Sequence, residues 1–391
     1  MVTSLLTFLS LTAFPPAGDH YSSTDSGRVR LASELAWESG RLSGNQYALL
    51  TNSSSQRLFN LADSLIKTER AAVFFSPEHG FGTNLPDGVH STDEQYKGRP
   101  VVSLYGNKKK PLTSDFGVAD TLLIDIQEVG LRWYTYLSTI RYCLESAAMA
   151  GIPVIILDRP NPLGGLISEG PIPDSTLMSF VGALPVPVRY GLTVGELFTM
   201  AQHQNWFPLM KDLKLTVIRM DGWKRSMLWP STGLDWIPPS PNLPTFQSLY
   251  WYSGTCLFEG TNLSEGRGTD LPFRWTGAPW LNPADSILFN QSGIRVQYDE
   301  KTPVSIPGRA HKPKYENERL PGFTMKSITG DRSVLQSIRQ VILSLQSAGR
   351  PLTIKPYLFQ LLGSRSVEET EEEMKALNDF RIESRLYHFY P

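Results

Sequence analysis

The alternation of short apolar runs with helical patterns constrains the fold of this chain more than any other feature. Amphipathic helical patterns cover 58–69 and 136–151, and the second of them ends at a glycine. Strands and helices in alternation are typical of a mostly parallel sheet with helices on both faces, so the sequence predicts a Rossmann-like α/β domain. The apolar runs that predict its strands are 46–51, 71–75, 101–105, 121–126, 153–158 and 213–220.

The length of 391 residues exceeds what one hydrophobic core usually holds, so we expect two domains. We place the N-terminal domain at 28–210 and the C-terminal domain at 211–391. Residues 221–281 are crowded with Trp, Pro, Gly and Asn, which indicates long ordered loops of the kind that carry sites. The Glu-rich segment 366–380 indicates a charged helix with a solvated face.

The composition argues against several classes of protein. The net charge is -1, from 37 basic and 38 acidic residues spread through the chain, which gives no electrostatic footprint for nucleic acid or for an anionic membrane. Cys143 and Cys256 lie far apart and without zinc-ligand spacing, so we expect buried thiols and no metal site. No GxGxxG or phosphate-loop motif supports a nucleotide cofactor.

The apolar run 4–14 bears on the compartment of the protein. It is too short to span a bilayer, so stable membrane insertion is not expected. It fits the core of a signal peptide, which favours export to the periplasm or beyond, although no basic residue precedes it. An irregular N-terminal segment of a cytoplasmic protein is the alternative.

Polar side chains follow three of the predicted strands at the point where each strand ends. In an open α/β sheet, ligands bind beyond the carboxyl ends of the strands, so we expect these side chains to converge on one rim. The three sets are Glu78 and His79, then Gln127, Glu128, Arg132 and Tyr134, and finally Asp158, Arg159 and Asn161.

Two of these sets also have a structural explanation. Asp158 and Arg159 could form an ion pair that fixes the proline-rich turn, and Glu128 could cap the helix that follows it. Glu78 differs from them, because Pro77 stiffens its approach and holds a carboxylic acid at the end of an apolar strand. Partial desolvation of such an acid suits a general acid, so we favour catalysis for Glu78.

Two loops of the second half add polar side chains. The segment 238–245 contains Asn242, and the glycine-rich segment 258–269 contains Asn262, Glu265 and Arg267. Backbone N–H groups of a glycine-rich loop can close around a hydroxylated or anionic ligand, although such loops often serve only as turns. Tryptophans in and near these loops could stack on a sugar ring or belong to the core.

Eight segments in this order resemble the NamZ-type exo-β-N-acetylmuramidases of bacteria: SPEHGF, DIQEVGLRWYTYLST, LDRPNPLGG, EGP, RYGLTVGEL, DGWKRSMLW, PPSPNLPT and GTNLSEGRGT. The resemblance extends from about residue 45 to 279, with an echo in the C-terminal RLYHFYP. It implies a Rossmann-like N-terminal domain, a smaller α/β (α+β) C-terminal domain and an active-site cleft between them. It also implies release of N-acetylmuramic acid from the non-reducing end of peptidoglycan fragments or muropeptides, without a cofactor.

The resemblance also implies roles for residues. Glycoside hydrolysis generally needs two carboxyl groups, and we assign Glu78 as the general acid, with His79 tuning it or contacting the sugar. Candidates for the second carboxylate are Glu128, which we rank first, then Glu169 of the EGP segment, and also Asp158 and Glu265. Candidates for a guanidinium that binds the lactyl carboxylate of the sugar are Arg132, Arg159, Arg189 and Arg267.

The chain departs from the family pattern in three places. Glu128 stands where the family usually has Asp, GTNLPDG replaces the usual Arg-Gly after SPEHGF, and residues 285–360 match poorly. Two other functions stay open: a muropeptide-binding protein without catalysis, and a metal-dependent hydrolase built on His79, Asp125 and Asp158. The absence of HxH and HExxH motifs disfavours the second of these.

Overall fold

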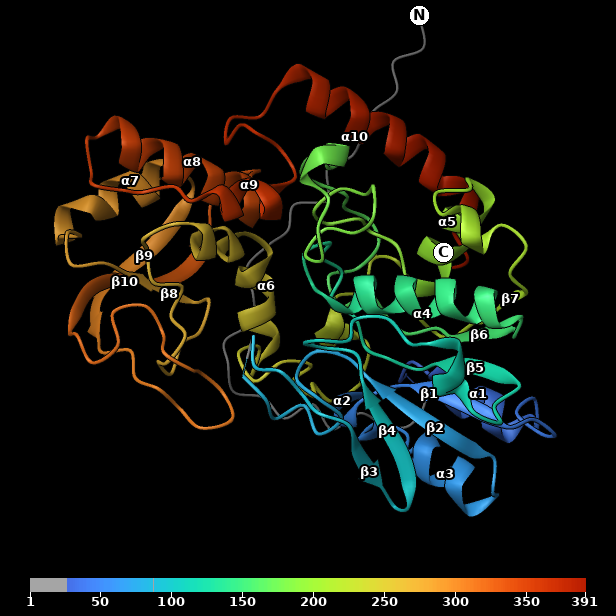
Figure 1. Cartoon of the computed structure of the whole chain (residues 1–391). Coiled ribbons are helices and arrows are strands. Elements are labelled where there is room, and N and C mark those ends of the chain that lie inside the picture. Colours follow the sequence, from blue (N-terminus) through green and yellow to red (C-terminus); the bar gives the residue numbers. More distant parts are fainter. Residues whose placement is uncertain (1–26, 87) are drawn as a thin grey trace, which may run out of the picture.

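A seven-stranded sheet forms the larger part of the computed structural model, which describes residues 27–86 and 88–391. The strand order is β3-β4-β2-β1-β5-β6-β7, and all neighbours are parallel except β3 and β4 (Figure 1). All six predicted strands form, and the short antiparallel edge strand β3 is an addition. The strands are β1 (Tyr47–Leu50), β2 (Ala71–Ser76), β3 (Glu94–Tyr96), β4 (Arg99–Ser103), β5 (Thr121–Ile124), β6 (Val154–Leu157) and β7 (Leu215–Ile218).

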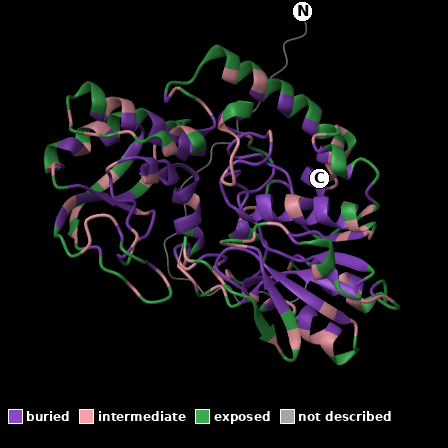
Figure 2. Ribbon diagram, in the orientation of Figure 1, coloured by how far each residue is buried: buried purple, intermediate pink, exposed green. Residues whose placement is uncertain are grey.

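Both faces of this sheet are buried, which explains why its strands are almost continuously apolar (Figure 2). Leu49 and Leu123 pack on one face with α1 and α3, whereas Leu50 and Ile124 pack on the other with α4 and α5. These helices, with the single turn α2, are α1 (Ala32–Glu38), α2 (Ser53–Gln56), α3 (Leu61–Lys67), α4 (Tyr136–Ala150) and α5 (Val194–His203). The predicted doubly wound α/β layout is confirmed.

The strand order reverses between β1 and β5. Strands β2 and β4 lie on one side of β1, whereas β5, β6 and β7 lie on its other side. In doubly wound sheets this switch point leaves a crevice outside the carboxyl ends of the strands, where ligands bind. The segments after β1, β2 and β5 therefore surround the place where a site is expected.

A smaller antiparallel sheet and five helices form the second part of the chain, beside the larger sheet (Figure 1). The sheet has the order β8-β10-β9, and a continuous apolar core joins α6 and α8 to the α4 side of the larger sheet. These elements are β8 (Trp275–Gly277), β9 (Ile294–Lys301), β10 (Leu320–Ile328), α6 (Phe246–Thr255), α7 (Ser286–Gln291), α8 (Val334–Ser347), α9 (Pro356–Leu362) and α10 (Glu371–Ser384).

Three expectations differ from this arrangement. Helix α6 lies within 221–281, where we expected only loops, because its aromatic sequence hides the helical pattern. The charged helix α10 begins at Glu371, five residues later than expected. Strand β7 pairs with β6 beyond residue 210, so we propose a domain boundary between β7 and α6 instead of at 210.

The remaining expectations concern the cysteines, membrane insertion, metal ligands and the N-terminal run. Cys143 and Cys256 are buried free thiols. Within residues 27–86 and 88–391, no helix has the length and apolar character that a membrane span requires. In the same residues no three His, Cys, Asp or Glu side chains gather as metal ligands would. The apolar run 4–14 lies outside the described residues.

Candidate active site

Glu78 lies two residues beyond β2, where the chain turns sharply away from the sheet. His79 and Gly80 both have a φ of +72°, the left-handed conformation that makes this turn. The Glu78 side chain is largely buried, with 8% exposed. Its Oε2 accepts a hydrogen bond from the Thr135 hydroxyl at 2.6 Å, and its Oε1 accepts one from the Gly88 N–H at 3.2 Å. Both oxygens are therefore held in one orientation.

His79 is fixed by the same turn. Its Nδ1 lies 2.9 Å from the carbonyl oxygen of Leu85, and because a carbonyl only accepts, Nδ1 carries the proton. A φ of +72° is uncommon for a residue other than glycine, so the surrounding structure holds His79 in a strained backbone conformation. Strain of this kind is frequent at functional sites.

Tyr136, in the first turn of α4, connects the segments around Glu78. Its hydroxyl accepts from the Asn52 amide at 2.9 Å, donates to the Pro239 carbonyl at 2.8 Å and lies 3.4 Å from the Glu78 carbonyl. Our sequence analysis missed Asn52, Thr135 and Tyr136. Asn52 lies two residues beyond the end of β1, and the rule that we applied to the other strand ends would have found it.

Glu128 lies after β5 and is buried. Its Oε2 accepts from the Gly130 N–H and from the Tyr190 hydroxyl, whereas its Oε1 is buried without a hydrogen-bond partner. Burial raises the pKa of Glu128 to about 7, although these donors oppose the rise. An acid of this kind exists in both protonation states near neutral pH.

Tyr134 lies near both Glu128 and Glu78. Burial raises the pKa of the Tyr134 phenol well above its ordinary value, and the neighbouring Tyr136, Glu78 and Glu128 raise it further. The Tyr134 hydroxyl therefore lies within electrostatic reach of both carboxylates. The structure thus brings Glu78, His79, Glu128 and Tyr134 together at the switch point, as we expected from their positions after the strands.

The glycine-rich loop of the second part of the chain carries a cluster of charges. Arg267 pairs with Glu259 at 3.0 Å and with Glu265 at 3.2 Å, and Lys314 pairs with Glu265 at 3.0 Å. Burial opposes ionisation of Glu265, but Lys314 and Arg267 outweigh it and lower the Glu265 pKa. Because this carboxylate is held by two cations, it is poorly suited to accept or donate a proton.

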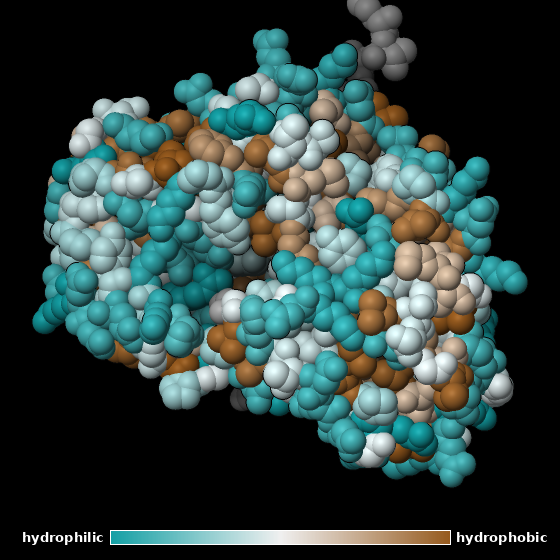
Figure 3. Space-filling view, viewed as in Figure 1, coloured by the Kyte–Doolittle hydropathy of each residue, from teal (hydrophilic) through white to brown (hydrophobic). Residues whose placement is uncertain are grey.

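Tyr357 of α9 lies near both this cluster and Glu78. Burial raises the pKa of the Tyr357 phenol, and the charges of Glu259 and Glu78 raise it further. Tyr357 therefore lies within reach of an acid from each part of the chain. A hollow bordered by hydrophilic side chains is visible between the two lobes (Figure 3).

Arg132 has a different environment from the one that we expected. Its Nη1 donates to the carbonyls of Pro171 and Val186 at 2.6 and 2.8 Å, and its Nη2 to those of Leu361 and Leu362 at 2.9 and 2.7 Å. Burial lowers the pKa of Arg132 to about 9. Both terminal nitrogens are used to attach α9 to the N-terminal part, so we leave Arg132 out of the proposed site.

Asp158 and Arg159 also bind protein groups, but not each other. Asp158 accepts from the hydroxyls of Thr193 and Tyr390 at 2.7 and 2.6 Å, and burial raises its pKa to about 6. Arg159 pairs with Asp125 at 2.7 Å. The ion pair that we considered between neighbours is therefore replaced by longer-range contacts.

The three predicted asparagines attach loops to one another. Each donates its amide to a backbone carbonyl, which makes the surrounding loops rigid. The distances are 2.9 Å from Asn161 to Leu192, 2.8 Å from Asn242 to Arg309 and 2.8 Å from Asn262 to Pro351.

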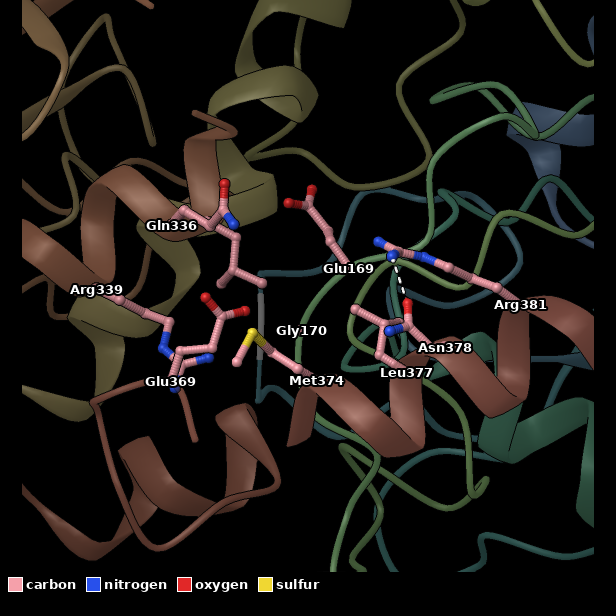
Figure 4. Close-up of a pocket in the computed structure, with 10 residues that line it drawn as sticks. Glu169, Gly170, Gln336, Arg339, Glu369, Met374, Leu377, Asn378 and Arg381 are labelled. Carbon is pink, nitrogen blue, oxygen red and sulfur yellow. Dashed lines mark hydrogen bonds between the residues drawn. The ribbon is translucent and has the colours of Figure 1, made fainter. Parts of the chain in front are cut away.

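Glu169 and Arg189 lie elsewhere. They form a backbone bridge, their side chains approach to 3.8 Å, and Arg189 also donates to the Leu163 carbonyl. Glu169 lines a cavity of about 240 Å³ with residues of α8 and α10, among them Arg339 and Arg381 (Figure 4). Burial raises the pKa of Glu169 and lowers that of Arg189. Glu169 therefore belongs to a different pocket from Glu78.

These features define a doubly wound α/β protein with a carboxylate site at its switch point, next to a second domain. Comparison with known families agrees with that class. The sequence profile of the N-terminal domain of the exo-beta-N-acetylmuramidase NamZ matches residues 47–247, and that of its C-terminal domain matches residues 250–390. The chain belongs to the NamZ exo-beta-N-acetylmuramidase family.

Individual relatives support the same assignment. The chain is 41% identical over 251 residues to the peptidoglycan beta-N-acetylmuramidase NamZ of Bacillus subtilis (strain 168). That match covers 63% of this chain and 60% of the relative's length. Crystal structures of two DUF1343 family proteins from Bacteroides fragilis NCTC 9343 superpose with TM-scores of 0.80 and 0.75, at 28% and 30% identity. Each covers 93% of this chain and 99% of its own.

Proposed function

We propose that the protein is an exo-acting glycoside hydrolase that releases N-acetylmuramic acid from the non-reducing end of peptidoglycan fragments. The substrate class comes from the name of the Bacillus subtilis relative, and the observation that carries the proposal for this chain is the setting of Glu78. This acid is largely buried, has both oxygens held by donors and lies within electrostatic reach of Tyr357 from the second part of the chain.

Glu78 is the general acid in this proposal. Its carboxyl group donates a proton to the glycosidic oxygen as the bond to the sugar breaks. The Thr135 hydroxyl and the Gly88 N–H fix its orientation, and His79 lies beside it with Nδ1 protonated. Proton transfer needs such a fixed geometry, because a general acid acts only within hydrogen-bond reach of its target.

Glu128 is our choice for the second carboxylate. The Tyr134 hydroxyl lies within electrostatic reach of both Glu128 and Glu78. Oε1 of Glu128 has no hydrogen-bond partner, so it can accept a hydrogen bond from water or from the sugar. Each of the other candidates is less suited. Asp158 accepts three hydrogen bonds, Glu265 is held by Arg267 and Lys314, and Glu169 lines a separate cavity.

The decisive experiment compares two leaving groups in Glu78→Gln. The natural disaccharide has a poor leaving group that needs protonation, whereas 4-nitrophenol leaves without it. We expect disaccharide cleavage to fall by roughly 10²- to 10⁴-fold, and cleavage of the nitrophenyl N-acetylmuramide to fall much less. Product analysis by mass spectrometry and release of nitrophenol measure the two rates.

Glu369→Gln is the matched control, because Glu369 is an exposed glutamate at the other cavity. Unchanged disaccharide cleavage in Glu78→Gln would remove Glu78 from the mechanism, and an equal loss for both substrates would exclude it as the acid. Binding of the disaccharide by the unaltered protein without any cleavage would instead identify a non-catalytic muropeptide-binding protein.

A further inference from the structure

A muramic acid substrate carries a lactyl carboxylate, and the four arginines predicted to bind it are bound elsewhere. Arg132 holds four backbone carbonyls, and Arg159 and Arg189 pair with buried acids. Arg267 lies between Glu259 and Glu265. A substrate carboxylate would have to compete with these groups, so another cation is required if the sugar's acid is recognised.

Arg309 differs from these arginines in the number of its unpaired nitrogens. Arg132, Arg159 and Arg189 each have one buried guanidinium nitrogen without a hydrogen-bond partner, whereas Arg309 has two. Its Nε and Nη2 are both buried without a hydrogen-bond partner. Leaving a buried donor unsatisfied is costly, and the cost is greater for a charged group. Burial lowers the pKa of Arg309, and the charge of Asp270 opposes this only in part. An acceptor that enters beside this side chain would therefore be favoured.

The segment around Arg309 is attached to three of the motifs that surround the site. The Arg309 carbonyl accepts from Asn242 at 2.8 Å, three residues from the Pro239 carbonyl that binds Tyr136. Gly308 closely approaches the loop after Glu78, because a Cβ at this glycine would lie 3.1 Å from the Asn84 carbonyl. Arg309 is thus fixed next to the walls of the site.

The same segment also touches the glycine-rich loop. Val304 donates its N–H to the Gly268 carbonyl at 3.0 Å, and Gly268 has a φ of +80°. A Cβ at Gly268 would lie 2.5 Å from the Val304 carbonyl, so only glycine permits this approach. Together these residues line an open groove of about 460 Å³, with Arg309 on its wall.

We propose that Arg309 binds a carboxylate of the substrate, the lactyl group of the terminal N-acetylmuramic acid, and so selects this sugar over N-acetylglucosamine. This inference rests on the proposed function for its choice of sugar. The other charges in the groove are already paired: Lys301 lies 2.9 Å from Asp270, the single acid of the lining, and 3.1 Å from Asp299. Among the described residues, Arg309 is the cation of the lining that has no ion pair. A planar guanidinium fork matches a carboxylate in two parallel hydrogen bonds.

Calorimetry with free sugars tests the inference without requiring catalysis. The unaltered protein, Arg309→Ala and Arg309→Lys are each titrated with N-acetylmuramic acid and with N-acetylglucosamine, which lacks the lactyl group. We expect Arg309→Ala to lose roughly 10- to 100-fold in affinity for N-acetylmuramic acid and to keep its affinity for N-acetylglucosamine. Arg309→Lys keeps the charge but loses the fork, so it should fall between the two.

Arg319→Ala is the control, because Arg319 is an exposed arginine of the same region that pairs with Glu300. N-acetylmuramoyl dipeptide, in which the lactyl acid is capped as an amide, separates the two possible carboxylates. A loss confined to this dipeptide would assign the carboxylate to the stem peptide and overturn the lactyl assignment.

Two outcomes separate this inference from the proposed function. Equal affinity of Arg309→Ala and the unaltered protein for N-acetylmuramic acid overturns the inference, even if Glu78 proves to be the acid. Selective binding that depends on Arg309 supports the inference, even if no hydrolysis is detected.

Discussion

The Thr135 hydroxyl decides how Glu78 is oriented, because it donates to Oε2 at 2.6 Å from the residue just before α4. We expect Thr135→Val to lower kcat on the disaccharide by about tenfold, with little change in KM, since the acid remains but is no longer held in place. Thr135→Ser keeps the hydroxyl and should restore most of the rate. Steady-state kinetics of the two variants measure the difference, and equal rates would deny Thr135 this positioning role.

The raised pKa of Glu128 predicts how the free energy of unfolding depends on pH. Its pKa is raised from 4.5 to about 7 in the folded protein, so folding takes up a proton between these values. The sign follows from proton binding: the folded state holds more protons than the unfolded state, so its stability falls as pH rises through this window. A shift of this size corresponds to about 3 kcal/mol. Glu128→Gln should therefore flatten the decline in unfolding free energy between pH 5 and pH 8.

Urea denaturation at several pH values measures this slope. Glu371→Gln is the control, because Glu371 is exposed at the start of α10, and it should leave the slope unchanged. Asp158, with its pKa raised to about 6, contributes a decline of the same sign, so Glu128→Gln should reduce the slope without removing it. An unaltered slope would show that Glu128 is solvated or paired in solution.

Helix α9 is attached to the larger domain through Arg132, whose Nη2 donates to the carbonyls of Leu361 and Leu362 at the end of that helix. Arg132→Met leaves four buried carbonyls without their donor, and we expect the free energy of unfolding to fall by more than about 3 kcal/mol. Arg365→Met is the control, because Arg365 is exposed and donates only to the Thr176 hydroxyl at 2.9 Å. Chemical denaturation measures both variants, and a loss below about 1 kcal/mol for Arg132→Met would contradict this role.

The sequence predicts the strands well, because apolar runs such as 71–75 and 121–126 owe their composition to burial on both faces of the sheet. It also predicts Glu78 and Glu128 at one rim, because both residues follow the carboxyl ends of strands in one parallel sheet. It does not predict α6, whose aromatic residues have weak helix propensity and are helical because they pack against α8. Tertiary packing decides such elements, and a pattern of local residues does not contain it.

The partners of charged side chains are equally hidden from the sequence. Arg132 and Arg309 look alike in the sequence, yet both terminal nitrogens of Arg132 bind carbonyls of residues 171 to 362, whereas Nε and Nη2 of Arg309 are buried without partners. Asp158 finds Tyr390, 232 residues away, instead of its neighbour Arg159. Contacts at such separations follow from the complete fold, so site residues are assigned reliably only after it is known.

Residues 389–391 return to the larger domain and bind polar groups there. Tyr390 donates its hydroxyl to the Asp158 carboxylate at 2.6 Å, and the Phe389 N–H donates to Glu196 at 2.7 Å. The Pro391 carbonyl accepts from the Arg225 N–H at 2.8 Å. Residues 389–391 thus bind polar groups of the larger domain near β6 and α5. These contacts join the two parts of the chain at a second place, in addition to those around Glu78.

Tyr390→Phe tests the hydrogen bond between Tyr390 and Asp158. Asp158 has an ordinary pKa of 3.8 that burial raises to about 6, and the Tyr390 hydroxyl opposes that rise by stabilising the carboxylate. Without this donor the Asp158 pKa rises further. The variant should lose roughly 1.5–3 kcal/mol of unfolding free energy at pH 8, where Asp158 of the unaltered protein is ionised. The loss should be much smaller at pH 5, where Asp158 is mostly protonated in both proteins. Urea denaturation at the two pH values measures the losses, with Tyr387→Phe as the control, because the Tyr387 ring packs on His203. Equal losses at pH 5 and pH 8 would contradict the hydrogen bond between the C-terminus and Asp158.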